Sequence, residues 1–380
     1  MTVTSLNSMR GLFPSTESVV YLNHAGVSPI AQPVVEAAHA VLADLLGGDP
    51  IGVFSGHLKR QEALRAAFGR MMNAPTASLG FVRNTSHGIS IAAQAIPFRR
   101  GDTVVVAENE YPANIYPWMA QKERGVRTHL VAPRENGVVR EDDLLAACEN
   151  DPRTRVLAVS WVQWGTGQRM DLARLGAFCR EREILFVVDI VQGLGALRLD
   201  VERDCVDIAA AGCHKWLLAP GGLGILYVRP EVFPTLIPAN LGWNSVTDPL
   251  DWEHLHFEKL KPTTDRFEEG TPSIVNTATL GASVALLESV GFESVERRVL
   301  ELADIARAAV KLKGCAVVSP SPLETRSGIV AFRHPTLSNE VVLRKLADHG
   351  ITLAVRCGNV RISPHAYNLE ADIERAAALL

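Results

Sequence analysis

The stretch Ile184-Leu-Phe-Val-Val-Asp-Ile-Val-Gln-Gly193 decides the fold class of this chain. A near-continuous apolar run such as 184–188 is typical of a strand buried on both faces of a parallel sheet. The run ends in Asp189, which places a carboxylate at the carboxyl end of that strand. Ligands of open α/β sheets bind outside this edge. The stretch therefore predicts a buried strand with a candidate site residue at its end.

The segments on either side of this strand alternate between strand and helix patterns. Further strand-like runs lie at 103–106, 126–131, 156–159, 206–210 and 224–228. Helical stretches lie at 89–96, 113–122, 141–148 and 172–182. Alternation of this kind predicts an α/β layer structure with a mostly parallel sheet between helices.

The pattern changes after about residue 270. Two long helical stretches, 276–289 and 293–312, come first. Shorter strands and helices follow at 315–319, 328–333, 339–349, 351–355, 360–363 and 369–379. This order predicts a smaller α+β domain at the C-terminus. We place a large domain at 20–265 and the small domain at 266–380, with the boundary in a stretch rich in proline and charge.

The bulk composition is that of an ordinary globular protein. Of 380 residues, 47% are hydrophobic and 21% are charged, and the formal net charge is −4. No run of like charges exceeds a few residues, so the sequence predicts no nucleic-acid partner and no anionic membrane surface as partner.

Targeting and metal signals are weak. Residues 1–11 lack the apolar segment of a secretory signal, and no stretch approaches the roughly 20 apolar residues that span a bilayer. The six cysteines are scattered, with no CxxC pair. We expect a reduced, cytoplasmic protein without a metal site.

A lysine motif follows the central strand. The segment Ala211-Gly-Cys-His-Lys-Trp216 precedes a glycine-rich turn and the strand at 224–228. Pyridoxal 5'-phosphate (PLP) needs a lysine that forms an imine with its aldehyde and an acid that pairs with its pyridine nitrogen. Lys215 and Asp189 are a lysine and an acid that could fill these two roles. Each alone is weak, because a strand-end aspartate is commonly a cap and a lone lysine is usually a solvated surface residue.

Several motifs in the same order resemble the class V aminotransferase superfamily of fold-type I PLP-dependent enzymes. They are Asp-x-x-Gln at 189–192, His-Lys at 214–215, Gly-Thr-Pro at 270–272 and Arg-x-Ser at 361–363. The resemblance runs from residue 21 to residue 368. Their joint spacing is far more specific than any one motif. The match is closer to the aminotransferase and isopenicillin N epimerase-like branch than to the cysteine desulfurases.

The resemblance implies roles for the central motifs. Lys215 is the Schiff-base lysine and then the base that shuttles the α-proton of the substrate. Asp189 pairs with the pyridine nitrogen, and Gln192 approaches the phenolic oxygen of the cofactor. His214 lies near the phosphate and the imine; alternatively, it is a packed histidine that only shapes the turn.

Two earlier segments complete the implied cofactor site. The turn Asn84-Thr-Ser-His-Gly88 opens a helix, and in the family it binds the cofactor phosphate, which points to Thr85 and Ser86. Both are also ordinary helix-capping residues. Tyr111 matches the aromatic residue that stacks on the cofactor ring; the alternative is a core or interface tyrosine.

The C-terminal motifs imply a substrate clamp and a second subunit. Arg361 matches the arginine that binds the substrate α-carboxylate, a suitable ligand for a planar guanidinium, and Arg356 is a second candidate for substrate binding. Thr271 matches a threonine that reaches the partner's cofactor phosphate across a dimer interface. The resemblance therefore implies a homodimer. It also implies that residues 1–19 pack with the small domain.

The sequence departs from the desulfurase pattern at several positions. A histidine stands in desulfurases where this chain has Tyr111, and their long loop with a nucleophilic cysteine has no match before Arg361. Cys357 lies nearby but in a different register. Gly212 replaces a phosphate-binding serine. Trp164 stands where an asparagine reaches the cofactor, and Gln163 is a candidate substitute.

These observations predict a PLP-dependent enzyme that acts on an α-amino acid, with an aminotransferase as the leading hypothesis. The alternatives are a β-lyase such as a cysteine desulfurase-like C–S lyase, an isopenicillin N epimerase-like racemase, and a binding protein that has lost catalysis. The reactions share their first steps, and the sequence does not identify the amino acid.

Overall fold

The structure, a computed structural model, describes residues 6–255 and 257–380 and has a seven-stranded sheet at its centre. Its order is β2-β8-β7-β6-β5-β3-β4. The strands are β2 (Leu79–Val82), β3 (Thr103–Ala107), β4 (Arg127–Val131), β5 (Thr154–Ser160), β6 (Leu185–Asp189), β7 (Ile208–Gly212) and β8 (Gly224–Val228). Only β8 runs antiparallel to its two neighbours. The predicted α/β fold with a mostly parallel sheet is confirmed.

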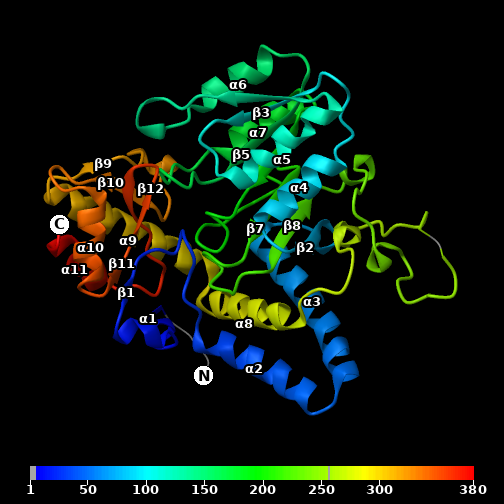
Figure 1. Cartoon of the computed structure of the whole chain (residues 1–380), viewed down its shortest axis with the longest axis horizontal. Helices are drawn as coiled ribbons and strands as arrows, with labels where there is room; N and C mark the ends of the chain where they lie inside the picture. The colour runs from blue at the N-terminus through cyan, green and yellow to red at the C-terminus, as the bar shows by residue number, and fades with distance from the viewer. Residues whose placement is uncertain (1–5, 256) are drawn as a thin grey trace.

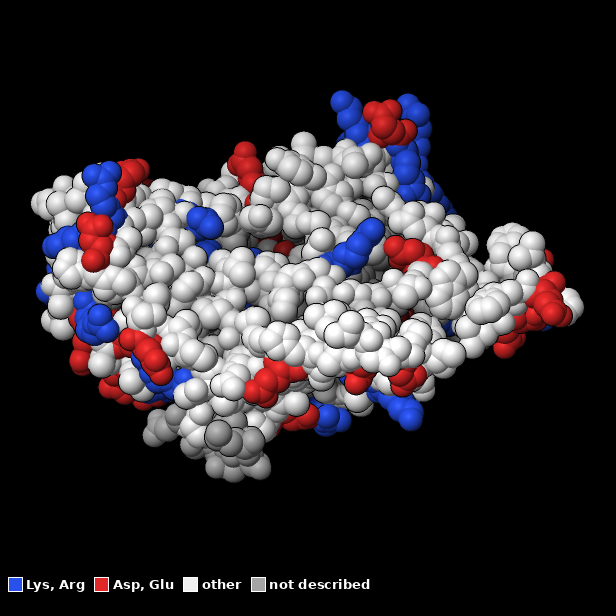
Figure 2. Space-filling view, turned by 60° about the horizontal axis from the view of Figure 1, so that its bottom comes forward, with Lys and Arg blue, Asp and Glu red and all other residues white. Residues whose placement is uncertain are grey.

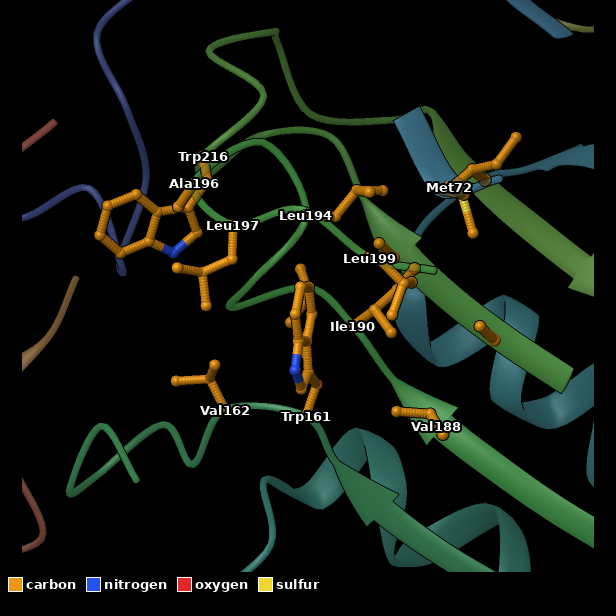
Figure 3. Close-up of a cluster of buried hydrophobic side chains, with 14 of the residues drawn as sticks. Met72, Trp161, Val162, Val188, Ile190, Leu194, Ala196, Leu197, Leu199 and Trp216 are labelled. Carbon is orange, nitrogen blue, oxygen red and sulfur yellow. The ribbon is translucent and has the colours of Figure 1, made fainter. Parts of the chain in front are cut away.

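Both faces of the sheet are buried, as the apolar strand runs predict. Along β3, Val105 belongs to one hydrophobic core, while Val104 and Val106 belong to the core on the opposite face. Every residue of β6 is buried. Beyond the ends of β5 and β6, Trp161 and Ile190 continue the first core (Figure 3). This packing fixes the loops that leave the carboxyl edge of the sheet.

Helices cover the two faces of the sheet (Figure 1). They include α2 (Gln32–Leu46), α3 (Pro50–Met72), α4 (Thr85–Ala95), α6 (Glu141–Glu149), α7 (Leu172–Glu181) and α8 (Ile274–Val290). At Gly88 of α4, an added Cβ would lie 2.5 Å from the Cβ of Ala210 in β7. Only a glycine lets α4 approach the sheet this closely, so the helix begins directly above the strand ends.

One predicted helix does not form as a single element. The stretch 113–122 is divided into a 3-10 turn (Pro112–Asn114), the short helix α5 (Tyr116–Met119) and a second 3-10 turn (Ala120–Arg124). Proline has no N–H to donate, and its ring excludes a preceding helical turn. Pro117 therefore interrupts what reads as one helix, and Pro112 opens the first 3-10 turn.

A smaller sheet lies beside the first (Figure 1), with the order β12-β13-β10-β9. Its strands are β9 (Ala316–Val317), β10 (Val330–Arg333), β12 (Ala354–Arg356) and β13 (Asn359–Ile362). Helices α9 (Phe292–Leu312), α10 (Asn339–Ala347) and α11 (Glu370–Ala378) belong to the same region. The strand predicted over 351–355 is two strands, because β11 (Ile351–Thr352) pairs with β1 (Val20–Tyr21) while β12 pairs with β13.

The N-terminal segment contacts this region as well. Helix α1 (Leu6–Arg10) ends at Arg10, which makes an ion pair of 2.8 Å with Asp372. The ring of Phe13 stacks on Tyr367 at 3.9 Å between centroids. The first five residues of the expected N-terminal tail lie outside the described residues. The division of the chain at 265/266 stays a prediction.

Two surface properties bear on partners. Among the described residues, no single helix is long and apolar enough to cross a membrane; α8 and α9 pass that test only as a pair, and they meet at a bend of 82°. On the face shown in Figure 2, Lys and Arg side chains lie among Asp and Glu rather than in one patch.

Candidate active site

A cavity of about 590 Å³ lies at the carboxyl edge of the large sheet. Most of the sequence-predicted site residues line it: Thr85, Ser86, Tyr111, Asp189, Gln192, His214, Lys215, Arg356 and Arg361. They come from both sheets and from segments far apart in the chain. Gln163 and Thr271 are not among its lining residues.

A second cavity, of about 960 Å³, is larger, but its charged side chains are less available to a ligand. Most arginines in its wall form ion pairs with carboxylates, such as Arg198–Glu296 at 2.7 Å and Arg203–Asp204 at 2.6 Å, and Arg169 donates to the Glu324 backbone carbonyl at 3.0 Å. Arginines and carboxylates that neutralise one another in ion pairs leave little net charge to bind a ligand. The smaller cavity is therefore the candidate active site.

Lys215 is held through its backbone, and its amine has no hydrogen-bond partner among the described residues. The hydroxyl of Ser28 donates to the Lys215 carbonyl at 2.6 Å, and the Ser28 N–H donates to the His214 carbonyl at 2.9 Å. The Lys215 Nζ lies 5.7 Å from the centre of the Tyr111 ring. Burial lowers the pKa of Lys215 to about 8, and the nearby Asp189 carboxylate opposes that shift. A larger fraction of this amine is neutral near neutral pH than for an ordinary lysine.

Asp189 is a buried acid with spare hydrogen-bonding capacity. Its side chain is 2% exposed, and its Oδ1 accepts the N–H of Val191 at 2.9 Å. Burial raises the pKa of Asp189 to about 6, against the attraction of Lys215. A cationic partner in the cavity would restore the charged form.

A second buried acid, Glu110, was missed by the sequence reasoning. It accepts hydrogen bonds from the N–H and hydroxyl of Ser160 and from the Gln163 side chain, the last at 2.7 Å. Burial raises the pKa of Glu110 to about 7, and the charge of Asp189 adds to the rise. The Gln163 side chain therefore contacts Glu110 and does not line the cavity, whereas the neighbouring Trp164 does line it. An acid directly before the aromatic Tyr111 is the only signal that could have found this site.

Gln192 and the aromatic residues shape the cavity wall. The Gln192 amide donates to the Ala25 carbonyl at 3.0 Å, and its oxygen accepts from the Trp216 indole at 3.1 Å. These two hydrogen bonds fix the orientation of the Gln192 side-chain amide, with its nitrogen toward Ala25 and its oxygen toward Trp216. The rings of Tyr111 and Trp164 meet edge to face at 5.3 Å.

The N-terminus of α4 points at the same cavity. Asn84, rather than Thr85 or Ser86, caps the helix, because its side chain accepts the His87 N–H at 2.9 Å. The Thr85 hydroxyl accepts the N–H of Gly212 at 2.8 Å, which ties the helix to the end of β7. Ser86 is exposed. The first N–H groups of a helix lack intrahelical acceptors and favour an anion.

Arg361 is a buried charge that has no carboxylate partner in the part of the chain that the structure describes. It is 1% exposed, donates to the Trp164 carbonyl at 2.6 Å and lies 3.4 Å from the Asn23 side-chain oxygen. Its Nε has no partner among the described residues. Burial and the nearby Arg356 lower the pKa of Arg361 to about 10. Burying an unpaired charge is costly, so this guanidinium is suited to an anionic ligand.

Two further residues lie at the margin. Cys357 sits in the turn between β12 and β13 and is not among the lining residues, and burial raises the pKa of its thiol. Thr271 is exposed at the surface, outside the cavity of its own chain.

Comparisons with known proteins give a consistent family. A family model described as aminotransferase class-V matches residues 20–375. A probable cysteine desulfurase of Pyrococcus abyssi is 26% identical, covering 97% of this chain and 94% of the relative. An uncharacterized aminotransferase of Schizosaccharomyces pombe is 27% identical, covering 84% of this chain and 81% of the relative.

Solved structures share the fold. The cystine C-S lyase C-DES, in complex with its product cysteine persulfide, has a TM-score of 0.87 at 23% identity and covers 96% of this chain and 98% of its own. The apo cysteine desulfurase of Thermococcus onnurineus has a TM-score of 0.86 at 24% identity, with 98% and 96% covered. The relatives carry both desulfurase and aminotransferase descriptions.

Proposed function

Because the chain belongs to the aminotransferase class-V family, whose cofactor is PLP, we propose that it is an aminotransferase acting on an α-amino acid. The observation that carries the proposal is the buried, unpaired Arg361 in the same cavity as Lys215 and Asp189. A cationic clamp suits the α-carboxylate that every amino acid carries. A lysine of lowered pKa suits proton transfer from the neighbouring carbon.

The residues present fit the cofactor. When bound, PLP supplies an electron sink that makes the α-proton of an amino acid removable. Lys215 would attach it, the Asp189 carboxyl would pair with its pyridine nitrogen, and Tyr111 would stack on its ring. Thr85, Ser86 and the first N–H groups of α4 hold its phosphate. The spare oxygen of Asp189 supports this assignment, as do the N–H groups at the start of α4 other than that of His87, which the Asn84 side chain accepts.

The cavity favours amino-group transfer over sulfur transfer to a protein thiol. None of the described residues that line it is a cysteine. Cys357 has a raised thiol pKa, and a neutral thiol is a poor nucleophile. A C–S lyase is the second candidate, because the C-DES structure is described as a cystine C-S lyase and a relative as a probable cysteine desulfurase. A racemase remains an alternative from the resemblance.

The test is product analysis with purified holoenzyme. A panel of L- and D-amino acids is supplied with a keto-acid acceptor. Transfer yields a new keto acid and a new amino acid in equal amounts. Sulfide or ammonia with no dependence on the acceptor would assign a lyase, and inverted substrate would assign a racemase. Either of these results overturns the proposal.

The lowered pKa of Lys215 predicts the pH dependence of cofactor attachment. Only the neutral amine attacks an aldehyde, so the attachment rate of PLP to apoenzyme should rise as pH increases through about 8. A free lysine side chain has its midpoint near 10.4. Stopped-flow absorbance across about pH 6 to 12 measures both midpoints, with N-α-acetyl-lysine as the control. A protein midpoint that coincides with the control would contradict the assignment.

We also propose a homodimer in which Thr271 contacts the partner's cofactor phosphate. The exposed position of Thr271, away from its own cavity, supports contact with a second copy. Loss of a hydrogen bond to a charged group costs about 1.5–3 kcal/mol. Thr271→Ala should therefore weaken PLP binding by roughly tenfold to a hundredfold.

Mixed dimers test the trans contact. Subunits with Thr271→Ala are allowed to exchange with inactive subunits that carry Lys215→Ala. A mixed dimer then holds one complete site, made of Lys215 from one subunit and Thr271 from the other. We expect tight PLP binding and activity to return at that site. If mixing restores neither, Thr271 acts within its own chain or has no role.

A further inference from the structure

The candidate cavity carries an excess of positive charge. Three cationic side chains line it, Lys215, Arg356 and Arg361, against a single carboxylate, Asp189. Arg356 contributes to the lowered pKa of both Lys215 and Arg361, so the three cations lie close enough to repel one another. Cations held together in this way are stabilised by bound anions.

A β-hairpin brings the two arginines together. In the β12–β13 ladder, Ala354 lies opposite Arg361, and Arg356 lies opposite Asn359. The two-residue turn between them has positive φ at Cys357 (50°) and Gly358 (72°), which matches a tight hairpin turn. Residues two apart on a strand share a face, so Arg356 is the diagonal neighbour of Arg361, roughly 7–8 Å away.

Arg356 has no acidic partner in the described part of the chain. The hydrogen bond that it makes there runs from its Nη1 to the carbonyl of the preceding residue, Val355, at 2.8 Å. It is exposed at the cavity mouth, where Arg361 is buried at the wall. An exposed arginine is often only solvated, but here it is the second uncompensated guanidinium on the same face of one hairpin.

Neither the cofactor phosphate nor the α-carboxylate of the substrate is assigned to Arg356. The cofactor phosphate belongs at the N-terminus of α4, on a different segment of the cavity wall from the hairpin. The α-carboxylate of the substrate belongs to Arg361. Resting on the proposed function, we infer that the substrate is an amino acid with a second carboxylate on its side chain, and that Arg356 binds this second group.

Binding of unreactive analogues tests the inference without chemistry. Succinate and glutarate carry two carboxylates, whereas butyrate carries one. Calorimetric titration of the holoenzyme should show at least about tenfold tighter binding of a dicarboxylate than of butyrate, the lower end expected for one charge-assisted hydrogen bond. Arg356→Gln should remove that preference, and Arg356→Lys should retain part of it. Arg344→Gln, an exposed arginine of α10, is the matched control for net charge and should leave it unchanged.

A second measurement compares reactive substrates. The ratio of kcat/KM for aspartate or glutamate to that for alanine should fall at least tenfold in Arg356→Gln. If cysteine sulfinate exceeds both in the wild-type enzyme, the second group is a sulfinate and the carboxylate assignment is overturned. Equal binding of dicarboxylates and butyrate to the wild-type enzyme also overturns the inference, whatever reaction is found. If dicarboxylates are preferred through Arg356 but no amino group is transferred, the inference stands and the proposed function fails.

Discussion

Lys215→Ala is expected to abolish covalent attachment of PLP and to lower amino-group transfer by more than about 10⁴-fold. That factor is the upper range for removing one general base, and Lys215 is also the attachment point. Its carbonyl is held by Ser28 and its amine makes no structural ion pair in the described chain, so the fold should survive its loss. Borohydride reduction followed by peptide mass spectrometry reads out the attachment site directly.

The matched control for this variant is Lys345→Ala, which removes an exposed lysine of α10. The control should keep the adduct on Lys215 and full activity. In the absence of PLP, circular dichroism and thermal unfolding should be the same for both variants; with PLP present, only the control gains the stabilisation of the attached cofactor. A reduced adduct of unchanged yield on another lysine of Lys215→Ala would show that a different residue carries the cofactor.

Removal of Arg361 is expected to damage substrate binding without damaging the fold. Loss of one partner from a buried charge pair costs about 2–5 kcal/mol of binding, so KM for every amino acid should rise by roughly 30-fold or more in Arg361→Met. The free energy of unfolding should stay within about 1 kcal/mol of the wild-type value or increase, because the change removes an unpaired buried charge.

Arg65 is a buried arginine whose removal, unlike that of Arg361, should lower the free energy of unfolding. It is also buried, but it makes an ion pair of 2.6 Å with the buried Glu268. Arg65→Met leaves that carboxylate unpaired and should lower the free energy of unfolding by about 3–5 kcal/mol. Denaturant unfolding of both variants separates the two roles. If Arg361→Met loses as much stability as Arg65→Met, Arg361 is a structural residue rather than a substrate ligand.

Much of the fold could be predicted from the sequence because its signals are local. The apolar run 184–188 is β6, and the strand–helix alternation gave the parallel sheet. The helix over 113–122 was wrong as one element, since Pro117 outweighs its helical pattern. The strand over 351–355 was divided because its two halves pair with different strands, and pairing is not a local property.

Prediction of the site from the sequence was limited in the same way, because contacts between distant segments are not a local property. Lys215 and Asp189 could be found because their motifs are local. The contact between Glu110 and Ser160 joins segments 50 residues apart and needs the register of the sheet. Gln163 and its neighbour Trp164 face different ways, and sequence alone does not settle which of two adjacent residues enters a cavity. The pairing of Arg356 with Arg361 on one face depends on the length of a hairpin turn in the same way.

The most direct test of the central claim is a single turnover without a keto acid. Holoenzyme is mixed with an excess of a reactive amino acid, and both the cofactor and the released product are quantified. An aminotransferase should yield one keto acid per active site and a cofactor that ends, and stays, as pyridoxamine phosphate. Continued consumption or inversion of the substrate, with the cofactor recovered as PLP, would contradict it and assign a lyase or a racemase.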